Sequence, residues 1–408
     1  MFGSKPKVIV DEAKIDELLS RGVIVDVLPS KDEFRKKLLS GERLKFYIGF
    51  DPTANTLHLS HAKNLILLEE FRTLGHEVIV LFGDFTARIG DPSGRTHARK
   101  PLSHDEILKN VADWKKQIAP LMNFKDRANP PQVMYNHTWL SKLTFEDVLA
   151  LASETTVQHI LERDMFEKRM NEGKPIHLHE FLYPVMQGYD SVAMGVDVEM
   201  CGTDQTFNAL MGRTLVRKRL KKEKFVVVVN LMENPKTGEL MSKSKKIGVF
   251  LNNDANTMFG EVMAQPDEMM RPLFLNITRI PLPQIETELS RNHPKETKLM
   301  LAEKITEIFY GLDAAQHARE NFEKTFSKGE ITEDVTKVAL YNNGQTYIDA
   351  LVYSGFLQSR TQARRLILDG GLFSVTRKAK ISDVYAQPQN EEIVRVGKKQ
   401  FAKMTLNK

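Results

Sequence analysis

The feature that most constrains the fold is a strand–helix–strand succession within the first hundred residues. Residues 9–40 have a helical pattern with polar interruptions, and residues 44–50 (LKFYIGF) form an apolar run that ends at an Asp-Pro turn, which predicts a strand. Residues 62–74 have apolar side chains at helical spacing and stop at Gly75, and residues 77–82 (EVIVLF) predict a buried strand. Such a βαβ unit forms a parallel sheet with a right-handed crossover, so we expect an α/β fold.

The remaining pattern divides the chain into three parts. Residues 225–230 (FVVVVN) predict another buried strand, so residues 1–250 are expected to form one domain. The next segment is mostly helical and interrupted by prolines, which predicts an α-helical domain over residues 251–330. Residues 326–336 are polar and contain glycine, as a linker would, and a last unit is expected over residues 338–408.

Composition excludes several classes of protein. The single cysteine, Cys201, excludes a disulfide framework and a cysteine-based zinc cluster, and it favours a reducing cytosol. The N-terminal segment lacks the apolar core and cleavage site of a secretory signal. No run of 18 apolar residues is present, so no membrane span is expected.

The excess positive charge is concentrated at one end of the chain. The net charge is +5, and residues 331–408, with 12 basic and 7 acidic side chains, account for all of it. A basic terminal unit on a neutral body indicates an acidic partner, with nucleic acid the first candidate.

Two histidines, His58 and His61, lie where the first predicted strand turns into a helix. A helix N-terminus offers free N–H groups to a phosphate, and imidazoles can add donors to a phosphoryl group. The pair alone is more typical of polar caps. A glycine-rich turn with Asp91 follows the second strand, and Arg95 and Arg99 lie just beyond it, where the alternative is a solvated surface loop.

A second group of polar residues is spaced for one face of a helix. Tyr183, Gln187 and Asp190 stand at i, i+4 and i+7 among apolar neighbours, as a small-molecule pocket requires, although an amphipathic helix with a solvated stripe has the same spacing. Residues 202–205 (GTDQ) follow a strand-like stretch at 196–200. Open α/β sheets bind ligands at the carboxyl ends of such strands.

A third segment is a short basic loop. Residues 238–248 are bracketed by glycines and contain Lys243, which could reach a polyphosphate, although an ordinary basic loop has the same composition. The charged stretch 213–224 is expected to be a solvated helix face.

Together these segments resemble the class I aminoacyl-tRNA synthetases, and specifically the tyrosyl subgroup. The two class signatures correspond here to His58-Leu-Ser-His61 and Leu240-Met-Ser-Lys-Ser244. The motifs that mark the tyrosyl subgroup are Tyr47-x-Gly-Phe-Asp-Pro-Thr53, Gly90-Asp-Pro-Ser-Gly94, Tyr183-x-x-x-Gln187-x-x-Asp190 and Gly202-x-Asp204-Gln205. The resemblance covers nearly the whole chain and implies a Rossmann-like parallel-sheet catalytic domain, an α-helical domain and a small α+β S4-like RNA-binding domain.

The resemblance implies a reaction in which L-tyrosine is activated by ATP and transferred to tRNA(Tyr). Tyr47 and Asp190 match the positions that hold the phenolic hydroxyl of tyrosine. The other positions matched to tyrosine or to its reacting carboxylate are Asp51, Asp91, Tyr183, Gln187 and Gln205.

The resemblance also implies an ATP site, with ATP as a substrate and Mg²⁺ arriving with it rather than at a dedicated protein site. The positions matched to ATP are Gly49, His58, His61, Gly202, Asp204, Met241 and Lys243. The positions matched to the chemical step are Thr53, His58, His61, Arg95, Arg99 and Lys243.

Two residues depart from the family pattern. Ser60 replaces the usual glycine of the first signature, where adenine lies close to backbone, and Leu240 replaces the first lysine of the second. Leu240 removes one of two ammonium groups expected on the pyrophosphate. Lys245 and Lys246 follow directly and are candidates to compensate for it.

The basic terminal unit resembles the S4 RNA-binding module. Residues 346–356 and 360–368 predict two short helices, and a strand is expected from Leu372. The residues expected to contact tRNA are Arg360, Arg364, Arg365, Arg377 and Lys378. The alternative is that the helix pair is simply exposed to solvent and binds no RNA.

The family resemblance further implies a cytoplasmic homodimer, with an interface insertion near residues 120–170. Two other functions fit parts of the pattern. One is a tryptophanyl relative, which the hydroxyl-binding pair Tyr47 and Asp190 argues against. The other is an RNA-binding protein that has lost catalysis, which Ser60 and Leu240 keep open.

Overall fold

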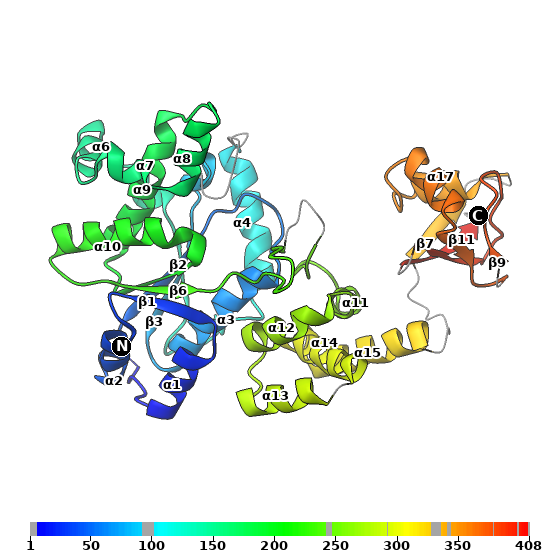
Figure 1. Cartoon of the computed structure of the whole chain (residues 1–408), viewed down its shortest axis with the longest axis horizontal. Helices are drawn as coiled ribbons and strands as arrows, with labels where there is room; N and C mark the ends of the chain where they lie inside the picture. The colour runs from blue at the N-terminus through cyan, green and yellow to red at the C-terminus, as the bar shows by residue number, and fades with distance from the viewer. Residues whose placement is uncertain are drawn as a thin grey trace. The chain divides into compact units, whose positions relative to one another are not determined.

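The computed structural model describes residues 6–91, 102–241, 247–291, 293–327, 336–340, 344–377, 379–397 and 400–406. The chain divides into two compact units, Met1–Arg319 and Glu320–Lys408 (Figure 1). The expected boundary between a catalytic and a helical domain near residue 250 lies inside the first unit.

The first unit is built around a six-stranded sheet of order β1-β6-β5-β2-β3-β4. Its strands are β1 (Ile24–Leu28), β2 (Lys45–Phe50), β3 (Glu77–Phe82), β4 (Gln132–Tyr135), β5 (Val198–Gly202) and β6 (Phe225–Val229). Neighbours from β6 to β4 are parallel, whereas β1 pairs with β6 antiparallel. The three strands expected from the sequence are confirmed. The helical pattern expected over residues 9–40 missed β1, because its five residues neither alternate between buried and exposed nor form a continuous buried run.

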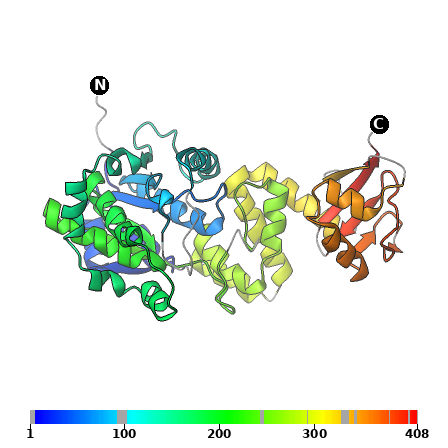
Figure 2. The same cartoon turned by 90° about the horizontal axis from the view of Figure 1, so that it is seen from above.

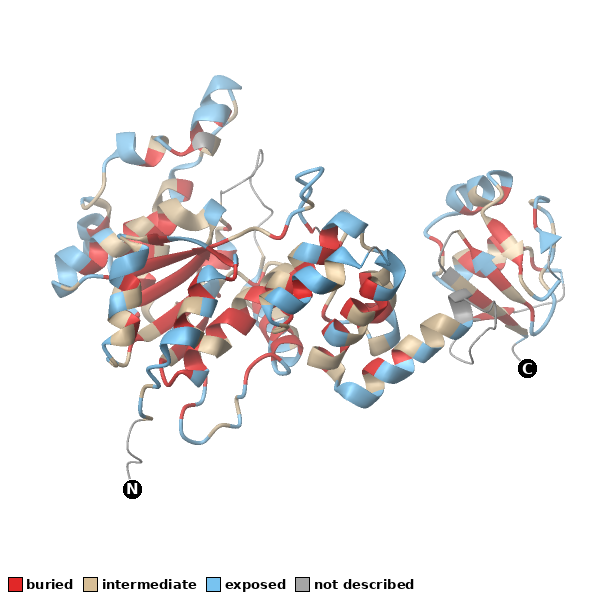
Figure 3. Ribbon diagram, turned by 60° about the horizontal axis from the view of Figure 1, so that its bottom comes forward, coloured by how far each residue is buried: buried red, intermediate tan, exposed pale blue. Residues whose placement is uncertain are grey.

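Helices cover this sheet and then continue as a helical segment. The helices of the sheet region are α1 (Glu12–Ser20), α2 (Lys31–Leu39), α3 (Leu59–Thr73), α4 (His104–Ile118), α5 (His137–Leu140), α6 (Phe145–Ala152), α7 (Val157–Leu161), α8 (Asp164–Asn171), α9 (Leu178–Met194) and α10 (Thr206–Leu220). Those that follow are α11 (Ala255–Met263), α12 (Met270–Ile277), α13 (Leu282–Ser290), α14 (Pro294–Tyr310) and α15 (Leu312–Ser327). Figure 3 shows the central strands of this sheet as largely buried and the exposed residues on the outer sides of the helices. Within the part of the chain that is described, no helix is both long and apolar enough to cross a membrane.

Helix α3 is the crossover between β2 and β3, and both of its ends are defined by local chemistry. It begins after His58, whose backbone is extended, three residues earlier than the apolar pattern predicted. It ends before Gly75, whose φ is +92°. A Cβ at Gly75 would lie 2.5 Å from the carbonyl oxygen of Lys7, so only glycine fits this close approach.

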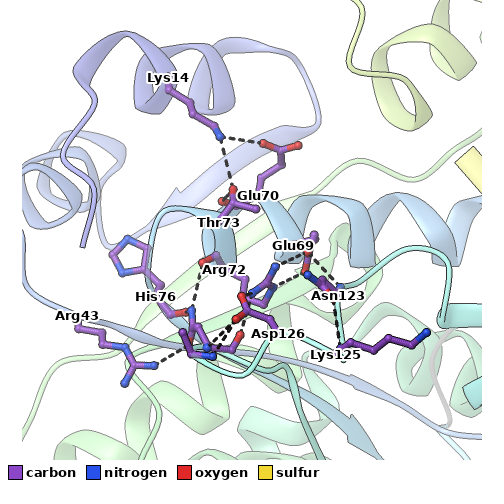
Figure 4. Close-up of polar contacts among 12 residues, drawn as sticks. Lys14, Arg43, Glu69, Glu70, Arg72, Thr73, His76, Asn123, Lys125 and Asp126 are labelled. Atoms are coloured by element: carbon purple, nitrogen blue, oxygen red, sulfur yellow. Dashed lines mark hydrogen bonds and ion pairs between the residues drawn. The ribbon is translucent and has the colours of Figure 1, made fainter. Parts of the chain in front are cut away.

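The amino ends of the central strands are held by a network centred on Arg72 at the end of α3 (Figure 4). The guanidinium of Arg72, 6% exposed, donates to both carboxylate oxygens of Glu69 at 2.7 Å and to Asp126 at 2.6 Å. Asn129 donates to the carbonyl oxygens of Arg72 and His76, and Arg43 donates to the Asn129 side chain. This cation therefore has two carboxylate partners, and their attraction offsets the free-energy cost of removing its charge from water.

The segment expected as an insertion near residues 120–170 is part sheet and part helix. Strand β4 lies within it and pairs with β3 in the main sheet. The helices α5 to α8 then follow before α9. Several of their large apolar side chains are exposed, including Phe145 at 78% and Val157 at 56%.

The second unit has a small five-stranded sheet of order β7-β11-β10-β8-β9 with two helices over it (Figure 2). Its elements are β7 (Thr336–Leu340), α16 (Tyr347–Tyr353), α17 (Arg360–Leu368), β8 (Leu372–Ser374), β9 (Ala379–Lys380), β10 (Ile393–Val396) and β11 (Gln400–Leu406). Tyr347, Leu351 and Ile367 from the helices pack in one core with Val394 and Met404 from the sheet. The two predicted helices and the strand from Leu372 are confirmed.

Candidate functional site

A cavity of about 370 Å³ opens at the carboxyl ends of β2, β3 and β5. It lies where open parallel sheets bind ligands. The residues predicted to bind substrate that line it are Tyr47, Gly49, Asp51, His58, His61, Asp91, Tyr183, Gln187, Asp190, Gly202, Asp204, Gln205 and Met241. Thr53 does not line it, and its backbone N–H donates to the Asp51 carbonyl oxygen at 2.8 Å. Arg95, Arg99, Lys243, Lys245, Lys246 and Lys378 lie outside the described residues.

One end of the cavity, which we call the Tyr47 end, is closed by a buried phenol and a buried carboxylate. Tyr47 is 1% exposed and its hydroxyl lies 2.9 Å from Ser191 Oγ. Asp190 is 2% exposed and accepts from Trp139 Nε1 at 2.7 Å and from Asn136 Nδ2 at 3.2 Å. A polar ligand group at this end would meet one hydroxyl and one carboxyl group.

Burial disfavours the ionised form of the Asp190 carboxyl group. Burial raises its pKa well above the usual range, and the hydrogen bonds from Trp139 and Asn136 oppose that shift. Among the described side chains, no cation lies within ion-pair distance of Asp190. These two donors fix the orientation of the carboxyl group, so that its remaining hydrogen-bonding positions face the cavity.

Beneath Tyr47 lies a buried ion pair between Lys224 and Glu199. Lys224 is 0% exposed and Glu199 2% exposed, and the ammonium also donates to Ser191 Oγ at 2.9 Å. The same ammonium lies 5.8 Å from the centre of the Tyr47 ring. The expectation that residues 213–224 form a solvated face is wrong at Lys224, which adjoins the buried strand β6, although Lys218 and Arg219 of α10 are exposed or half-buried.

A chain of hydrogen bonds links the wall of the cavity to Asp51. Tyr183 Oη donates to Asp51 Oδ2 at 2.8 Å, and Thr86 Oγ1 donates to Asp51 Oδ1 at 2.7 Å. Asn136 donates to Thr86 at 3.0 Å and so connects Asp51 to the Asp190 carboxylate. These bonds join α9, the 3₁₀ helix η1 (Thr86–Arg88) and the turn that follows β2, and so pre-organise the site.

The mouth of the cavity is ordered by amide side chains. Gln205 Nε2 donates to Asp91 Oδ2 at 2.5 Å, and Asn208 donates to Gln205 at 2.8 Å and to Gln187 at 3.0 Å. Gln187 in turn donates to Glu199 at 3.2 Å. The i, i+4, i+7 face of α9 therefore lines a pocket, as predicted, and is not a solvated stripe.

The other end of the cavity, which we call the histidine end, contains His58 and His61 with ring centres 4.1 Å apart. His61 Nδ1 accepts from the His58 backbone N–H at 3.3 Å, so the proton of the neutral ring lies on Nε2. Burial lowers the pKa of His58 to about 4 and that of His61 well below its usual value, with the neighbouring His58 adding to the effect. Both imidazoles are thus neutral donors at pH 7.

The turn before α3 is fastened to the segment that follows the lysine loop. Leu59 N–H donates to Val249 at 3.1 Å, and Leu251 N–H donates to Leu57 at 3.0 Å. Leu240, Met241 and Ser60 all line the cavity. Described residues of both signature motifs therefore line one cavity, among them the two that depart from the family pattern.

Sequence reasoning missed several residues that shape the cavity. They are Lys63, Thr86, Asn136, Trp139, Ser191, Glu199 and Lys224. None belongs to the motifs named above; Glu199 lies within β5 and Lys224 directly precedes β6. A charged residue placed within or beside a fully buried strand was the available signal.

The arginines of the second unit occupy two different environments. Arg364 and Arg365 are exposed on α17, and Arg360 is exposed and pairs with Asp349 at 2.7 Å. Arg377 is also exposed, with 37% of its side chain accessible, but its Nε donates to the buried Glu392 at 2.7 Å and its guanidinium contacts the Tyr347 hydroxyl. Three of the predicted arginines thus lie on a helical surface, and the fourth is held at the surface by the buried Glu392.

The described residues contain no cluster of three or more histidine, cysteine, aspartate or glutamate side chains that could hold a metal ion. The polar groups that line the cavity are imidazoles, amides, hydroxyls, separate carboxyl groups and the ammonium of Lys63, which suits a small ligand with several polar or charged groups.

Comparisons with known proteins agree with this geometry. The model of the class I tRNA synthetases for tryptophan and tyrosine matches residues 39–327. The chain is 38% identical to the tyrosine–tRNA ligase of Desulfotalea psychrophila over 95% of this chain and 97% of the relative. It is 39% identical to the tyrosine–tRNA ligase of Aquifex aeolicus over 91% and 94% of the two chains.

Solved structures share the fold at low sequence identity. A truncated mitochondrial tyrosyl-tRNA synthetase from Aspergillus nidulans superposes with a TM-score of 0.66 at 23% identity, over 77% of this chain and 94% of the other. The tyrosyl-tRNA synthetase from Archaeoglobus fulgidus, solved with L-tyrosine, gives 0.59 at 19% identity, over 76% and 100%. The expected fold, a Rossmann-like sheet followed by helices and a small S4-like unit, is confirmed. The chain belongs to the class I tRNA synthetase family of the tryptophan and tyrosine enzymes.

Proposed function

We propose that this protein is a tyrosine–tRNA ligase. It activates L-tyrosine with ATP to give tyrosyl-adenylate and pyrophosphate, and it then transfers tyrosine to the 3′ end of tRNA(Tyr). The observation that carries the proposal is the Tyr47 end of the cavity, where a buried hydroxyl and a buried carboxyl group face the same space in a class I chain. An indole ring offers no hydroxyl to this pair, which disfavours tryptophan.

Binding of tyrosine uses the polar groups of the cavity wall. The substrate hydroxyl donates to Asp190 and accepts from Tyr47, whose pKa burial holds well above its usual value, so the phenol stays protonated. Tyr183, Gln187 and Asp91 surround the ammonium group. Phenylalanine would make no hydrogen bond with either buried partner, and tyrosyl-tRNA synthetases are the standard example of such discrimination.

The first step forms one bond and breaks another at the α-phosphorus of ATP. A carboxylate oxygen of tyrosine attacks in line, and the electron pair of the broken bond leaves with pyrophosphate. The neutral imidazoles of His58 and His61 donate hydrogen bonds to the phosphates, Asp204 binds the ribose, and Asp51 and Gln205 position the reacting groups. Gly49, Gly202 and Met241 shape the nucleotide site.

Groups from segments outside the described residues complete this step in the proposal. Lys243, Arg95 and Arg99 bind the pyrophosphate, and Lys245 or Lys246 compensates for Leu240. Thr53 is a described residue outside the cavity lining, and its place on the phosphate side rests on the family resemblance alone. Mg²⁺ bound to ATP neutralises part of the triphosphate charge. If Lys245→Ala and Lys246→Ala leave pyrophosphate exchange unchanged, the compensation by these lysines is wrong.

In the second step a hydroxyl of the terminal ribose of tRNA attacks the carbonyl carbon of the adenylate, and AMP leaves. We propose that Arg360, Arg364 and Arg365 contact the tRNA backbone, with Lys378 beside them, while Arg377 supports the unit through Glu392. Because phosphate contacts depend on counterion release, tRNA affinity should fall steeply with salt. The Arg364→Ala/Arg365→Ala variant should flatten that dependence.

We also propose a cytoplasmic homodimer. The exposed apolar side chains of the α6–α9 region, including Phe145, Leu149 and Leu178, provide a surface that a second copy can cover. The expected interface lies near residues 120–170. Analytical ultracentrifugation of Phe145→Glu/Leu149→Glu against the unmodified chain tests it, with a monomeric variant expected and an unchanged mass opposing it.

The test of the function itself is ATP–pyrophosphate exchange driven by single amino acids. Exchange with tyrosine alone is expected. Exchange with tryptophan alone would overturn the assignment, and no exchange with any amino acid would favour a non-catalytic RNA-binding protein.

A further inference from the structure

One buried cation at the histidine end has no part in the reaction as proposed above. Lys63 lies in the second turn of α3, two residues after His61, and it lines the cavity with Asn64 and Asp204. Its side chain is only 2% exposed. An ammonium this deeply buried requires an electrostatic partner to remain charged.

The protein supplies Lys63 with a weak partner. Its Nζ donates to Asn64 Oδ1 at 2.8 Å, a neutral amide oxygen. Among the described residues, none of the ion pairs within 4.0 Å includes Lys63, whereas the buried Lys224 has Glu199. Asp204 is the carboxylate whose charge acts on Lys63, from beyond ion-pair distance.

The electrostatics of the histidine end favour the binding of an anionic ligand next to Lys63. Burial lowers the pKa of Lys63 to about 7, and the charge of Asp204 opposes that shift. The histidines and carboxyl groups that share its pocket are His58, His61, Asp51, Asp91, Asp190, Glu199 and Asp204, of which Asp204 acts on Lys63 most directly. The two histidines are neutral at pH 7, and Lys63 is the one lysine or arginine among the described residues that line the cavity, so an anion bound there would meet its ammonium group.

We propose that Lys63 is a nucleotide-binding residue that donates to a phosphate of ATP at the histidine end of the cavity and supplies positive charge where Leu240 does not. This inference rests on the proposed function, because it assumes that ATP occupies the cavity. Leu240 and Lys63 line the same cavity, so a cation lost from the loop and a cation present on the helix act on one bound polyphosphate.

The first test is the kinetic effect of Lys63→Met in tyrosine-driven pyrophosphate exchange. The KM for ATP should rise about tenfold or more, as expected for a lost hydrogen bond to a charged group, while the KM for tyrosine stays unchanged. The control is Lys45→Met. Lys45 is a partly buried lysine at the amino end of β2 that donates to the Met194 carbonyl oxygen and lies 3.7 Å from Glu77. It should leave both KM values unchanged.

The second test measures protons rather than catalysis. In the absence of tyrosine, calorimetric titration with Mg·ATP at pH 8, in two buffers of different ionisation enthalpy, should show uptake of roughly half a proton or more, because a lysine that is mostly neutral when free becomes charged when bound. Lys63→Met should abolish this uptake. A purely structural lysine would produce neither result.

The third test is the pH dependence of the KM for ATP. The KM of the unmodified enzyme for ATP should rise between pH 6.5 and 8.5, as free Lys63 loses its proton, and the profile of Lys63→Met should be flat over that range. An unchanged KM for ATP in the variant, or equal proton uptake in both proteins, would overturn the role of Lys63. If the unmodified chain shows no tyrosine-driven exchange but still takes up protons with ATP, the proposed function fails and the nucleotide contact stands.

Discussion

Buried charges around the central sheet are of two kinds. Arg72 meets Glu69 and Asp126 at the amino ends of the strands, and Lys224 meets Glu199 beneath Tyr47, so each of these buried cations has a carboxylate partner. In the cavity toward the carboxyl ends, by contrast, Lys63 has only an amide and Asp190 only neutral donors among the described residues. Matched charges stabilise the fold by themselves, whereas an unmatched one is compensated when a ligand brings the opposite charge or the missing hydrogen bond.

The largest expected effect comes from breaking the matched pair beneath Tyr47. Lys224→Met leaves Glu199 buried without its cation, so the free energy of unfolding should fall by about 3–5 kcal/mol in urea titrations. Lys222→Met is the matched control, because Lys222 pairs with Asp197 at 2.7 Å but is partly exposed, and its loss should change stability by about 1 kcal/mol or less. Equal losses in the two variants would contradict the comparison.

A nearly opposite result is expected from the unmatched carboxylate. Asp190→Asn keeps the size of the side chain but changes what it offers to the substrate hydroxyl, so kcat/KM for tyrosine should fall about 10- to 100-fold, while the Kd for ATP stays unchanged. Stability should stay the same or increase, since burial disfavours the ionised form of Asp190.

The stability gained by Asp190→Asn should depend on pH. The pKa of Asp190 is higher in the folded state than in the unfolded state, so this group favours folding below its unfolded pKa and that contribution is lost as pH rises. The increase in Tm caused by Asp190→Asn should therefore be larger at pH 8 than at pH 5. A gain confined to pH 5 would show that Asp190 is stabilised as an anion.

A smaller effect, confined to stability, is expected at the Arg72 network. Arg72→Met removes a cation whose two carboxylate partners are themselves partly exposed, so unfolding should become easier by about 2 kcal/mol. The kinetic constants of the folded enzyme should not change, because the network lies at the amino ends of the strands. A raised KM for ATP or tyrosine would show that the two ends are not independent.

The smallest effect tests the histidine end by adding a charge. Leu240→Lys restores an ammonium to a half-exposed residue of the cavity and should lower the KM for ATP a few-fold. In the Lys63→Met background the same substitution should recover part of the lost affinity. No recovery would mean that the two positions act on different parts of the nucleotide.

The parallel core of the fold and most of the site could be predicted from the sequence, because both depend on local patterns. The runs 44–50, 77–82 and 225–230 are apolar enough to identify strands, and the motif residues could be placed in a cavity by their resemblance to a family. Strand β1 could not be found in this way, because it pairs antiparallel at the edge of the sheet and alternates only partly.

The charges that surround the motif residues depend on tertiary contacts that no spacing encodes. Lys224 lies 25 residues from Glu199 and reaches it only because β5 and β6 pair side by side. The sequence shows Lys63 as one lysine in an amphipathic helix, and only the structure shows that it faces the cavity. Thr53 was matched by its motif but does not line the cavity.

The absence of a side chain at residue 212 limits how this enzyme can be redesigned. A Cβ at Gly212 would lie 2.6 Å from Lys224 Nζ and 2.9 Å from Ser191 Oγ, and a Cβ at Gly188 would lie 3.1 Å from the Gly212 nitrogen. A mutational library that enlarges the Tyr47 end for other amino acids can vary the residues facing the ligand. Gly188 and Gly212 must be kept, since a single added methyl group at either position would push α9 and α10 apart. The residues of α9 that line the cavity would then be displaced.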